Sequence, residues 1–166
     1  MKSISTWSGL ESYLILVVEM ALRDALNRIQ KIYIEHIDLD VYKAGRGTNF
    51  YVGGSMQPTF GLRDSVSNMI IKKQKYYISG GIYHDEAKMI LDQDNYVHGS
   101  PWNGGTDVRK SLPEIINDGL SGKLFGPGWW QAPRPFISNT LEELQTNGTV
   151  KKIFLEVFKG MGIKAV

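Results

Sequence analysis

The strongest periodic pattern in this chain lies near its N-terminus, and it limits what the remaining residues can fold into. Apolar residues recur there at steps of three and four, at Leu10, Leu14, Val17, Val18, Ala21, Ala25, Ile29 and Ile32. This spacing predicts one amphipathic helix from about Ser8 to Ile34, on the order of 40 Å long. Ser8 and Glu11 fit a capping box at its start. The helix is long for a small domain, so we expect its outer half to lie on a neighbouring molecule.

The composition is that of a globular chain. Its 166 residues suit one core, and we expect a single domain over residues 1–166. A net charge of +2 is too small for a nucleic-acid clamp or a polybasic membrane anchor. The absence of cysteine excludes disulfides, thiolate catalysis and cysteine-ligated zinc. The apolar run Leu14–Val18 lies between Glu11 and Glu19 and is too short for a secretory signal or a membrane span.

The middle of the chain predicts a small sheet. His36–Tyr42 alternates apolar and polar residues, which is typical of a half-buried strand. Met69–Ile71 and Tyr76–Tyr83 are rich in β-forming residues and flank a lysine-bearing turn, so they predict an antiparallel hairpin. Gly80, followed by a second glycine, marks a bulge or a close backbone approach.

The last third predicts helices. Ser111 and Glu114 fit a second capping box, and Gly119 ends that short helix. Two further apolar faces then follow, and they would point in opposite directions on one continuous helix. These faces are Ile137, Leu141 and Leu144, and then Val150, Ile153, Phe154, Val157, Phe158 and Met161. We therefore expect a turn at Asn147-Gly148, with Thr149 capping a helix that ends at Gly160 and residues 163–166 adding an edge strand.

These elements predict an α+β fold. A long N-terminal helix and C-terminal helices pack on a small antiparallel sheet with a β-hairpin. The expected core residues are Leu14, Val18, Ala25, Ile29, Phe154 and Phe158.

A rigid aromatic segment precedes the first C-terminal helix. Trp129 and Trp130 are adjacent, and two indoles in a soluble chain must be buried in a core or against a partner. Prolines on either side of Arg134 keep the following approach extended, and Phe136 then opens the helix. The segment is either a structural corner or a docking surface. As a docking surface, it makes Trp102, Trp129, Trp130, Arg134 and Phe136 candidates for a subunit or partner interface.

No catalytic pattern is present in the sequence. The three histidines form no dyad or triad, and there is no phosphate-binding loop. His84-Asp85-Glu86 comes nearest to a metal cluster, but no further ligand stands at a suitable spacing. We therefore expect no catalytic site, no metal and no cofactor.

Four pieces stand in a fixed order along the chain. The long helix is followed by Thr59–Val66 before the hairpin, by Ala132–Ile137 opening a helix, and by Phe158–Ile163 near the end. This order resembles the tail-completion or head-tail joining (neck) proteins of long-tailed double-stranded DNA bacteriophages, the minor-tail-protein-Z-like group. The Leu-Arg-x-Ser block at Leu62 and the Arg-Pro-Phe block at Arg134 carry the resemblance.

The resemblance implies a structural subunit and not an enzyme. Such proteins form a homo-oligomeric ring, here expected to be a hexamer, in the virion neck after assembly in the host cytoplasm. The implied partners are a head-completion or connector protein on one side and a tail terminator or tail tube protein on the other. Double-stranded DNA would pass through the lumen without sequence-specific binding, which a near-neutral chain permits. Aromatic residues of the kind found at interface cores agree with this role.

Two other classes of function remain open. One is a small nucleic-acid-binding module that uses the hairpin from Lys72 to Tyr77, where three lysines are followed by two tyrosines. Salt-dependent DNA affinity with a monomeric mass would favour it. The other is a metal-dependent enzyme around His84, Asp85 and His98, which stoichiometric metal in the purified protein would favour.

Overall fold

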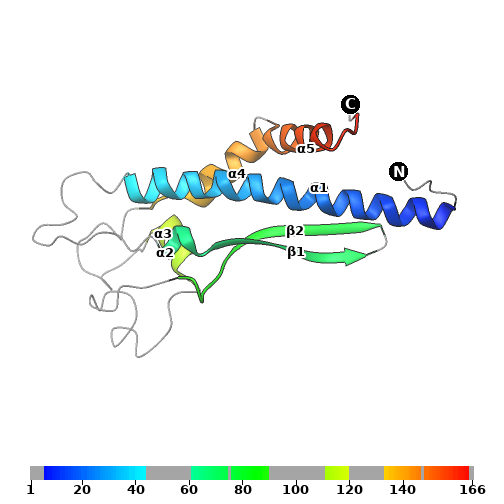
Figure 1. Ribbon diagram of the computed structural model, residues 1–166. Coiled ribbons are helices and arrows are strands. Elements are labelled where there is room, and N and C mark those ends of the chain that lie inside the picture. Colours follow the sequence, from blue (N-terminus) through cyan, green and yellow to red (C-terminus); the bar gives the residue numbers. More distant parts are fainter. Residues whose placement is uncertain are drawn as a thin grey trace, which may run out of the picture. The chain divides into compact units, whose positions relative to one another are not determined.

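The computed structural model describes residues 6–43, 61–74, 76–89, 111–119, 133–146 and 148–164 (Figure 1). They form an α+β structure with a long N-terminal helix, C-terminal helices and one antiparallel hairpin, so the predicted fold class is confirmed. The elements in chain order are α1 (Trp7–His36), the π-helical segment η1 (Ile37–Lys43), α2 (Gly61–Asp64), β1 (Val66–Gln74), β2 (Tyr77–His84), α3 (Leu112–Asp118), α4 (Phe136–Thr146) and α5 (Thr149–Gly160).

The chain divides into two compact units. The first, called here the hairpin unit, comprises Met1–Lys31, Asn68–Tyr83 and Leu144–Val166. The second, the helical unit, comprises Ile32–Ser67 and His84–Glu143. Helix α1, the hairpin and α4 each contribute residues to both units. The single domain expected over residues 1–166 stays a prediction.

Helix α1 begins one residue earlier than the sequence pattern suggests. The Gly9 amide donates to Thr6 Oγ1 at 3.1 Å, and the Leu10 amide donates to the Thr6 carbonyl at 3.0 Å. Thr6 therefore accepts hydrogen bonds from backbone N–H groups of the first turn, which have no partner within the helix. The capping box predicted at Ser8 and Glu11 is wrong. The predicted helix itself is confirmed and extends to His36.

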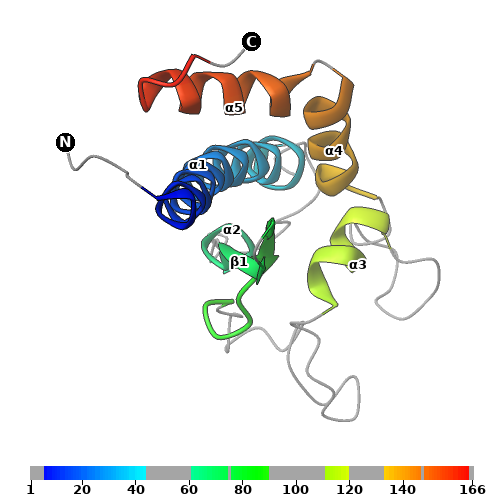
Figure 2. The same cartoon turned by 90° about the vertical axis from the view of Figure 1, so that its right-hand side faces the viewer.

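In the hairpin unit, α1 lies between the hairpin and α5 (Figures 1 and 2). The Asn68 side-chain amide donates to Asn27 Oδ1 at 3.0 Å and to Gln30 Oε1 at 2.5 Å. A Cβ atom at Gly80 would meet the Leu26 side chain and would lie 2.9 Å from the Met69 carbonyl oxygen. The close approach predicted at Gly80 is therefore confirmed, because only a glycine leaves room for Leu26 there.

Helix α5 packs on α1 from the other side. It buries Ile153 and Val157, and Glu156 Oε2 accepts a hydrogen bond from Arg28 Nη1 at 2.8 Å. Gly148, with φ at 59°, separates α5 from α4, so the predicted turn is confirmed. Gly148 also occupies the N-cap position without a side-chain cap, and the cap predicted at Thr149 is wrong. Beyond Gly160 the described residues 163–164 are not in a strand.

The predicted core is only partly right. Ala25 is buried, as expected, and Phe154 and Phe158 are half-buried with ring centroids 6.2 Å apart. Leu14 and Val18 are 52% and 46% exposed, so their assignment to the core is wrong. They lie on the correct helical stripe, but the described elements do not cover its N-terminal end.

The helical unit begins where a strand was predicted, and that prediction is wrong. Residues 37–43 continue α1 as a π-helical segment. Ile37 and Val41 are both buried, whereas Leu39 is exposed, which is the spacing of a helix face. In so short a segment, Ile37, Leu39 and Val41 fit the alternation of a strand. Ile37 and Val41 alone equally fit one face of a helix, with Leu39 exposed to solvent.

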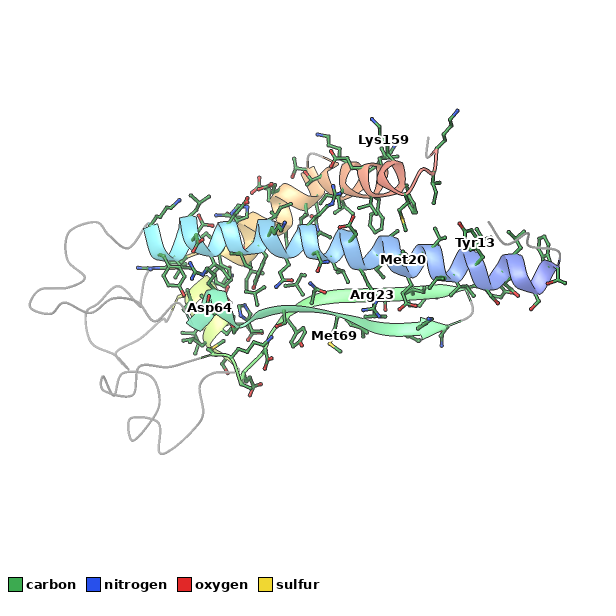
Figure 3. The ribbon with its side chains drawn as sticks, in the orientation of Figure 1. Tyr13, Met20, Arg23, Asp64, Met69 and Lys159 are labelled. Carbon is green, nitrogen blue, oxygen red and sulfur yellow. The ribbon has the colours of Figure 1, made fainter. Side chains whose placement is uncertain are left out.

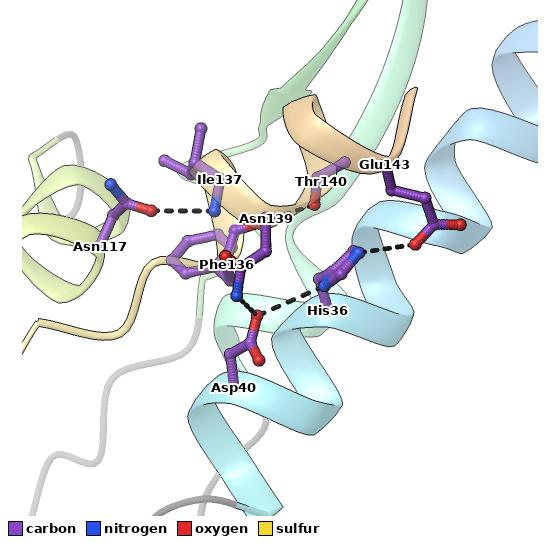
Figure 4. Close-up of polar contacts among 8 residues, drawn as sticks. All are labelled: His36, Asp40, Asn117, Phe136, Ile137, Asn139, Thr140 and Glu143. Atoms are coloured by element: carbon purple, nitrogen blue, oxygen red, sulfur yellow. Dashed lines mark hydrogen bonds and ion pairs between the residues drawn. The ribbon is translucent and has the colours of Figure 1, made fainter. Parts of the chain in front are cut away.

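Two side chains attach α4 to this segment and to α3. Asn117 Oδ1 accepts from the Ile137 amide at 2.9 Å, which caps α4 from a different helix (Figure 4). Arg134 Nη1 donates to the Val41 carbonyl at 2.6 Å, near the C-terminal end of η1. Gly119 ends α3, as predicted, but Ser111 forms no side-chain cap, so the second capping box is wrong.

Polar contacts continue along α4. His36 Nε2 lies 2.9 Å from Glu143 Oε2, and His36 Nδ1 lies 3.4 Å from Asp40 Oδ2. The Asn139 side-chain amide donates to the same Asp40 oxygen at 2.9 Å (Figure 4). Together these contacts fix the C-terminal end of α1 against α4 inside the helical unit.

Candidate subunit interface

The outer half of α1 exposes an apolar surface that the described residues do not cover. Tyr13–Val18 is an uninterrupted apolar run, so its side chains point to all sides of the helix. A helix that is apolar all round is normally buried. Here Leu14 and Leu16 are 52% and 53% exposed, and the N-terminal turns of α1 extend beyond α5 (Figure 1). Among the residues that the structure describes, the run therefore lacks the packing that its composition demands.

One side of this half forms a groove with the tip of the hairpin. The groove has a volume of about 300 Å³ and only one charged residue in its lining. It is lined by Trp7, Leu10, Glu11, Leu14, Ile15, Val18, Tyr76, Tyr77 and Ile78. Trp7 and Tyr76 are each 81% exposed, so two aromatic rings stand at its edges. Shape and composition together suit an apolar partner segment.

A second exposed stripe runs along the same half of α1. Tyr13, Leu16 and Met20 recur at steps of three and four, and all three are exposed (Tyr13 and Met20 are labelled in Figure 3). At about 100° per residue, this stripe lies on roughly the opposite side of the helix from Leu14 and Val18. We call these three residues the outer stripe. The outer half of α1 thus presents two apolar surfaces in different directions.

A polar cluster stands beside this surface. Glu19 Oε1 accepts from Arg23 Nη2 at 2.8 Å, and Glu19 Oε2 accepts from Lys73 Nζ of the hairpin. Hydrogen bonds from Lys73 and then Arg23 lower the pKa of Glu19. Lys73 is therefore committed to α1, which weakens the idea that the hairpin lysines form a nucleic-acid site. Lys72 lies 5.9 Å from the centroid of the Tyr77 ring, and Lys75 is outside the described residues.

The helical unit holds a different group of polar side chains around His84. Ser65 Oγ donates to the Leu62 carbonyl at 2.8 Å, so its single proton is used there. The 2.7 Å contact between Ser65 Oγ and His84 Nδ1 must then be donated by His84. His84 Nε2 in turn accepts from the Tyr33 hydroxyl at 3.0 Å. Burial lowers the pKa of His84 to about 4 and raises the pKa of Tyr33.

This arrangement does not activate a nucleophile. A catalytic serine must give its proton to the histidine, whereas the Ser65 hydroxyl donates to the Leu62 carbonyl. Ser65 is also fully buried and beyond the reach of a substrate. The group is a buried network in which every polar atom has a partner. The spacing of these residues in the sequence gives no hint of it, because the three side chains come from distant segments.

Of the residues proposed for a metal-dependent enzyme, the structure describes His84 and Asp85. Asp85 Oδ1 accepts from the Ala87 amide at 3.1 Å, and Asp85 Oδ2 pairs with Lys88 at 3.5 Å. His98 lies outside the described residues. Within the described ranges, no three His, Cys, Asp or Glu side chains are placed to hold a metal ion.

The residues predicted for an interface fall into two groups. Trp102, Trp129 and Trp130 lie outside the described residues. Phe136 is 0% exposed and packs edge-on against Tyr33 with ring centroids 5.6 Å apart, so its assignment to an interface is wrong. Arg134 binds a carbonyl within its own unit. The length of α1 predicted that its outer half would be exposed. It did not predict that the tip of the hairpin forms one side of the groove.

Comparison with known proteins identifies no relative. The chain matches no protein-family model, no curated protein and no solved structure. Across the described parts of the chain, no helix has the length and apolar character needed to cross a membrane.

Proposed function

We propose that this protein is a structural virion subunit of a long-tailed bacteriophage. Copies of it form a ring in the neck that joins the head connector to the tail. The observation that supports this proposal most strongly is the uncovered outer half of α1. The family resemblance of the sequence supplies the place of the ring in the virion.

The amount of exposed apolar surface supports a protein partner. Aromatic side chains bury about 150–250 Å² each, and the half-exposed residues of the groove and the outer stripe together offer on the order of 1,000 Å². In a head-to-tail contact this is the total area from both partners, and it reaches the lower bound of about 1,000 Å² for a specific interface. The partner we assign to this surface is a neighbouring copy of the same chain.

The two surfaces of α1 support a ring and not a symmetric dimer. A head-to-tail contact requires two different faces on each subunit, and repetition of that contact closes a ring when the rotation permits. The outer stripe of one copy (Tyr13, Leu16 and Met20) would pack into the groove of the next, which contains Leu14 and Val18. Each subunit then uses both apolar surfaces of α1.

The double variant Leu16→Asp, Met20→Asp tests this proposal. Both side chains are exposed in the subunit, so the variant should fold normally, but two carboxylates cannot enter an apolar groove. We expect native mass measurements to show loss of the ring. Complementation of a phage that lacks the gene should fail to join heads to tails.

The matched control is Leu39→Asp, Leu141→Asp, which places the same charges at equally exposed positions in the helical unit. This control should assemble and complement normally. If the outer-stripe variant still yields infectious particles, or if particles form without the protein, the proposed function is wrong.

A further inference from the structure

The positive charge of this chain is concentrated at its C-terminal end. Residues 144–166 contain four lysines and one carboxylate, Glu156. The preceding residues contain fifteen basic and sixteen acidic side chains, so they are close to neutral. The net charge of +2 therefore arises entirely from the last part of the hairpin unit.

Helix α5 arranges this charge on one face. Lys151, Lys152 and Lys159 are exposed, and at about 100° per residue they share one side of the helix. Figure 3 shows Lys159 on the side of α5 that faces away from α1. Two turns separate Lys151 from Lys159, which is about 12 Å along the axis. We call these three residues the lysine face.

No acid within the described residues neutralises this face. The sole carboxylate of α5, Glu156, already pairs with Arg28 at 2.8 Å, and none of the three lysines forms an ion pair with a described residue. Lys164, just beyond the helix, is also exposed. The lysine face is therefore open to an anionic partner.

The burial of the apolar side of α5 argues against a membrane surface as the anionic partner. Helices that bind membrane surfaces insert an apolar face next to their basic one. In α5 that face is occupied, because Ile153 and Val157 are buried within the hairpin unit. Binding through the lysine face must then rely on charge alone, as it does with a phosphodiester backbone.

We infer that the lysine face of α5 contacts the phosphate backbone of double-stranded DNA. The inference rests on the proposed function for its partner, and it assigns the lysine face to the lumen of the ring through which the duplex passes. Three lysines per subunit give weak contacts that do not depend on sequence, so DNA can still slide. Repetition around the ring keeps the duplex centred.

The test is a titration of a labelled duplex of about 30 base pairs with the full chain, followed by fluorescence anisotropy. Three phosphate contacts predict that the affinity falls roughly 40-fold between about 50 and about 200 mM salt. The variant Lys151→Gln, Lys152→Gln, Lys159→Gln should lose most of this salt dependence. The control Lys31→Gln, Lys43→Gln, Lys72→Gln has the same net charge and should bind like the natural sequence.

Several outcomes would overturn the inference. They are no binding by the natural sequence at low salt, equal losses in both triple variants, or a loss confined to the control that contains Lys72. Equal affinity for a polyglutamate peptide would assign the face to an acidic protein instead. Native mass measured in parallel separates the two proposals, because a chain that binds DNA through α5 yet never assembles contradicts the ring alone.

Discussion

The described residues of the two units differ in how completely their side chains find partners within their own unit. In the helical unit, His36, Asp40, Asn117 and Arg134 all find partners within the unit, and Phe136 is fully enclosed. Among the exposed large apolar residues of the described ranges, only Leu39 and Leu141 belong to this unit.

The hairpin unit shows the opposite balance. It contributes the exposed apolar residues Trp7, Leu10, Tyr13, Leu14, Leu16, Val18, Met20, Met69, Ile71, Tyr76, Tyr77, Tyr83 and Ile163. Contiguous apolar patches of several hundred Å² on a folded chain are typical of binding surfaces. The comparison teaches that the described side chains of the helical unit are satisfied within that unit, whereas the hairpin unit leaves apolar surface for the partner proposed above.

The largest expected effect is in the enclosed unit. Replacing Phe136 by alanine removes a ring that is 0% exposed and should lower the free energy of unfolding by about 3–5 kcal/mol. Leu141→Ala, on the exposed side of the same helix, should cost under about 1 kcal/mol. Urea unfolding of both variants measures the difference. Similar losses at the two positions would break the distinction between the inner and outer faces of α4.

The next effect concerns pH and the buried network. The pKa of His84 is lowered from 6.5 to about 4, so the unfolded chain binds a proton here that the folded chain rejects. The contribution of His84 to the free energy of unfolding is fully present above a pH of about 6.5. It decreases as the pH falls toward about 4, by up to about 3 kcal/mol. An NMR titration of the His84 ring should give the lowered pKa directly. A value near 6.5 would show that the ring is not enclosed.

A smaller effect is expected where the hairpin meets α1. A Cβ atom at Gly80 would press on Leu26 and on the Met69 carbonyl oxygen, so Gly80→Ala should cost about 1–3 kcal/mol. Gly160→Ala is the matched control, since nothing lies within 4 Å of a Cβ atom there. Thermal unfolding of the two variants should differ clearly. Equal stability would mean that the hairpin does not pack closely on α1.

The smallest expected effect on monomer stability is that of Leu14→Ala, which separates stability from assembly. Leu14→Ala should change the stability of the monomer by under about 1 kcal/mol, because the side chain is half-exposed. Leu26→Ala, at a position only 4% exposed on the same helix, should cost about 2–5 kcal/mol. Yet Leu14→Ala should weaken assembly, which native mass at several concentrations would detect. Unchanged assembly would remove Leu14 from the contact.

Local signals in the sequence were sufficient for much of the fold. The apolar stripe of α1, the hairpin, the glycine at position 80 and the turn at Gly148 each depend on neighbouring residues, and all are confirmed. Residues 37–43 were misassigned, because a short alternating pattern also fits a helix with Ile37 and Val41 on one face.

Long-range contacts were not predictable in the same way. The network of Tyr33, Ser65 and His84 joins three segments that carry no common motif. Phe136 was assigned to an interface because the preceding segment is aromatic and proline-rich, yet its ring is fully buried and packs against Tyr33. The length of α1 did indicate an uncovered half, since a small domain cannot enclose so long a helix.

Disulfide cross-linking between copies tests the central claim most directly, and the chain is suited to it because it contains no cysteine. The double variant Leu14→Cys, Met20→Cys places one thiol in the groove and one on the outer stripe. Head-to-tail packing predicts that mild oxidation gives a ladder of covalent oligomers ending in one ring-sized species. Each single variant should form no covalent oligomer, because its one thiol faces no thiol on the neighbouring copy. Complete dimerisation of the Leu14→Cys variant alone, or no cross-linking in the double variant, would contradict the account.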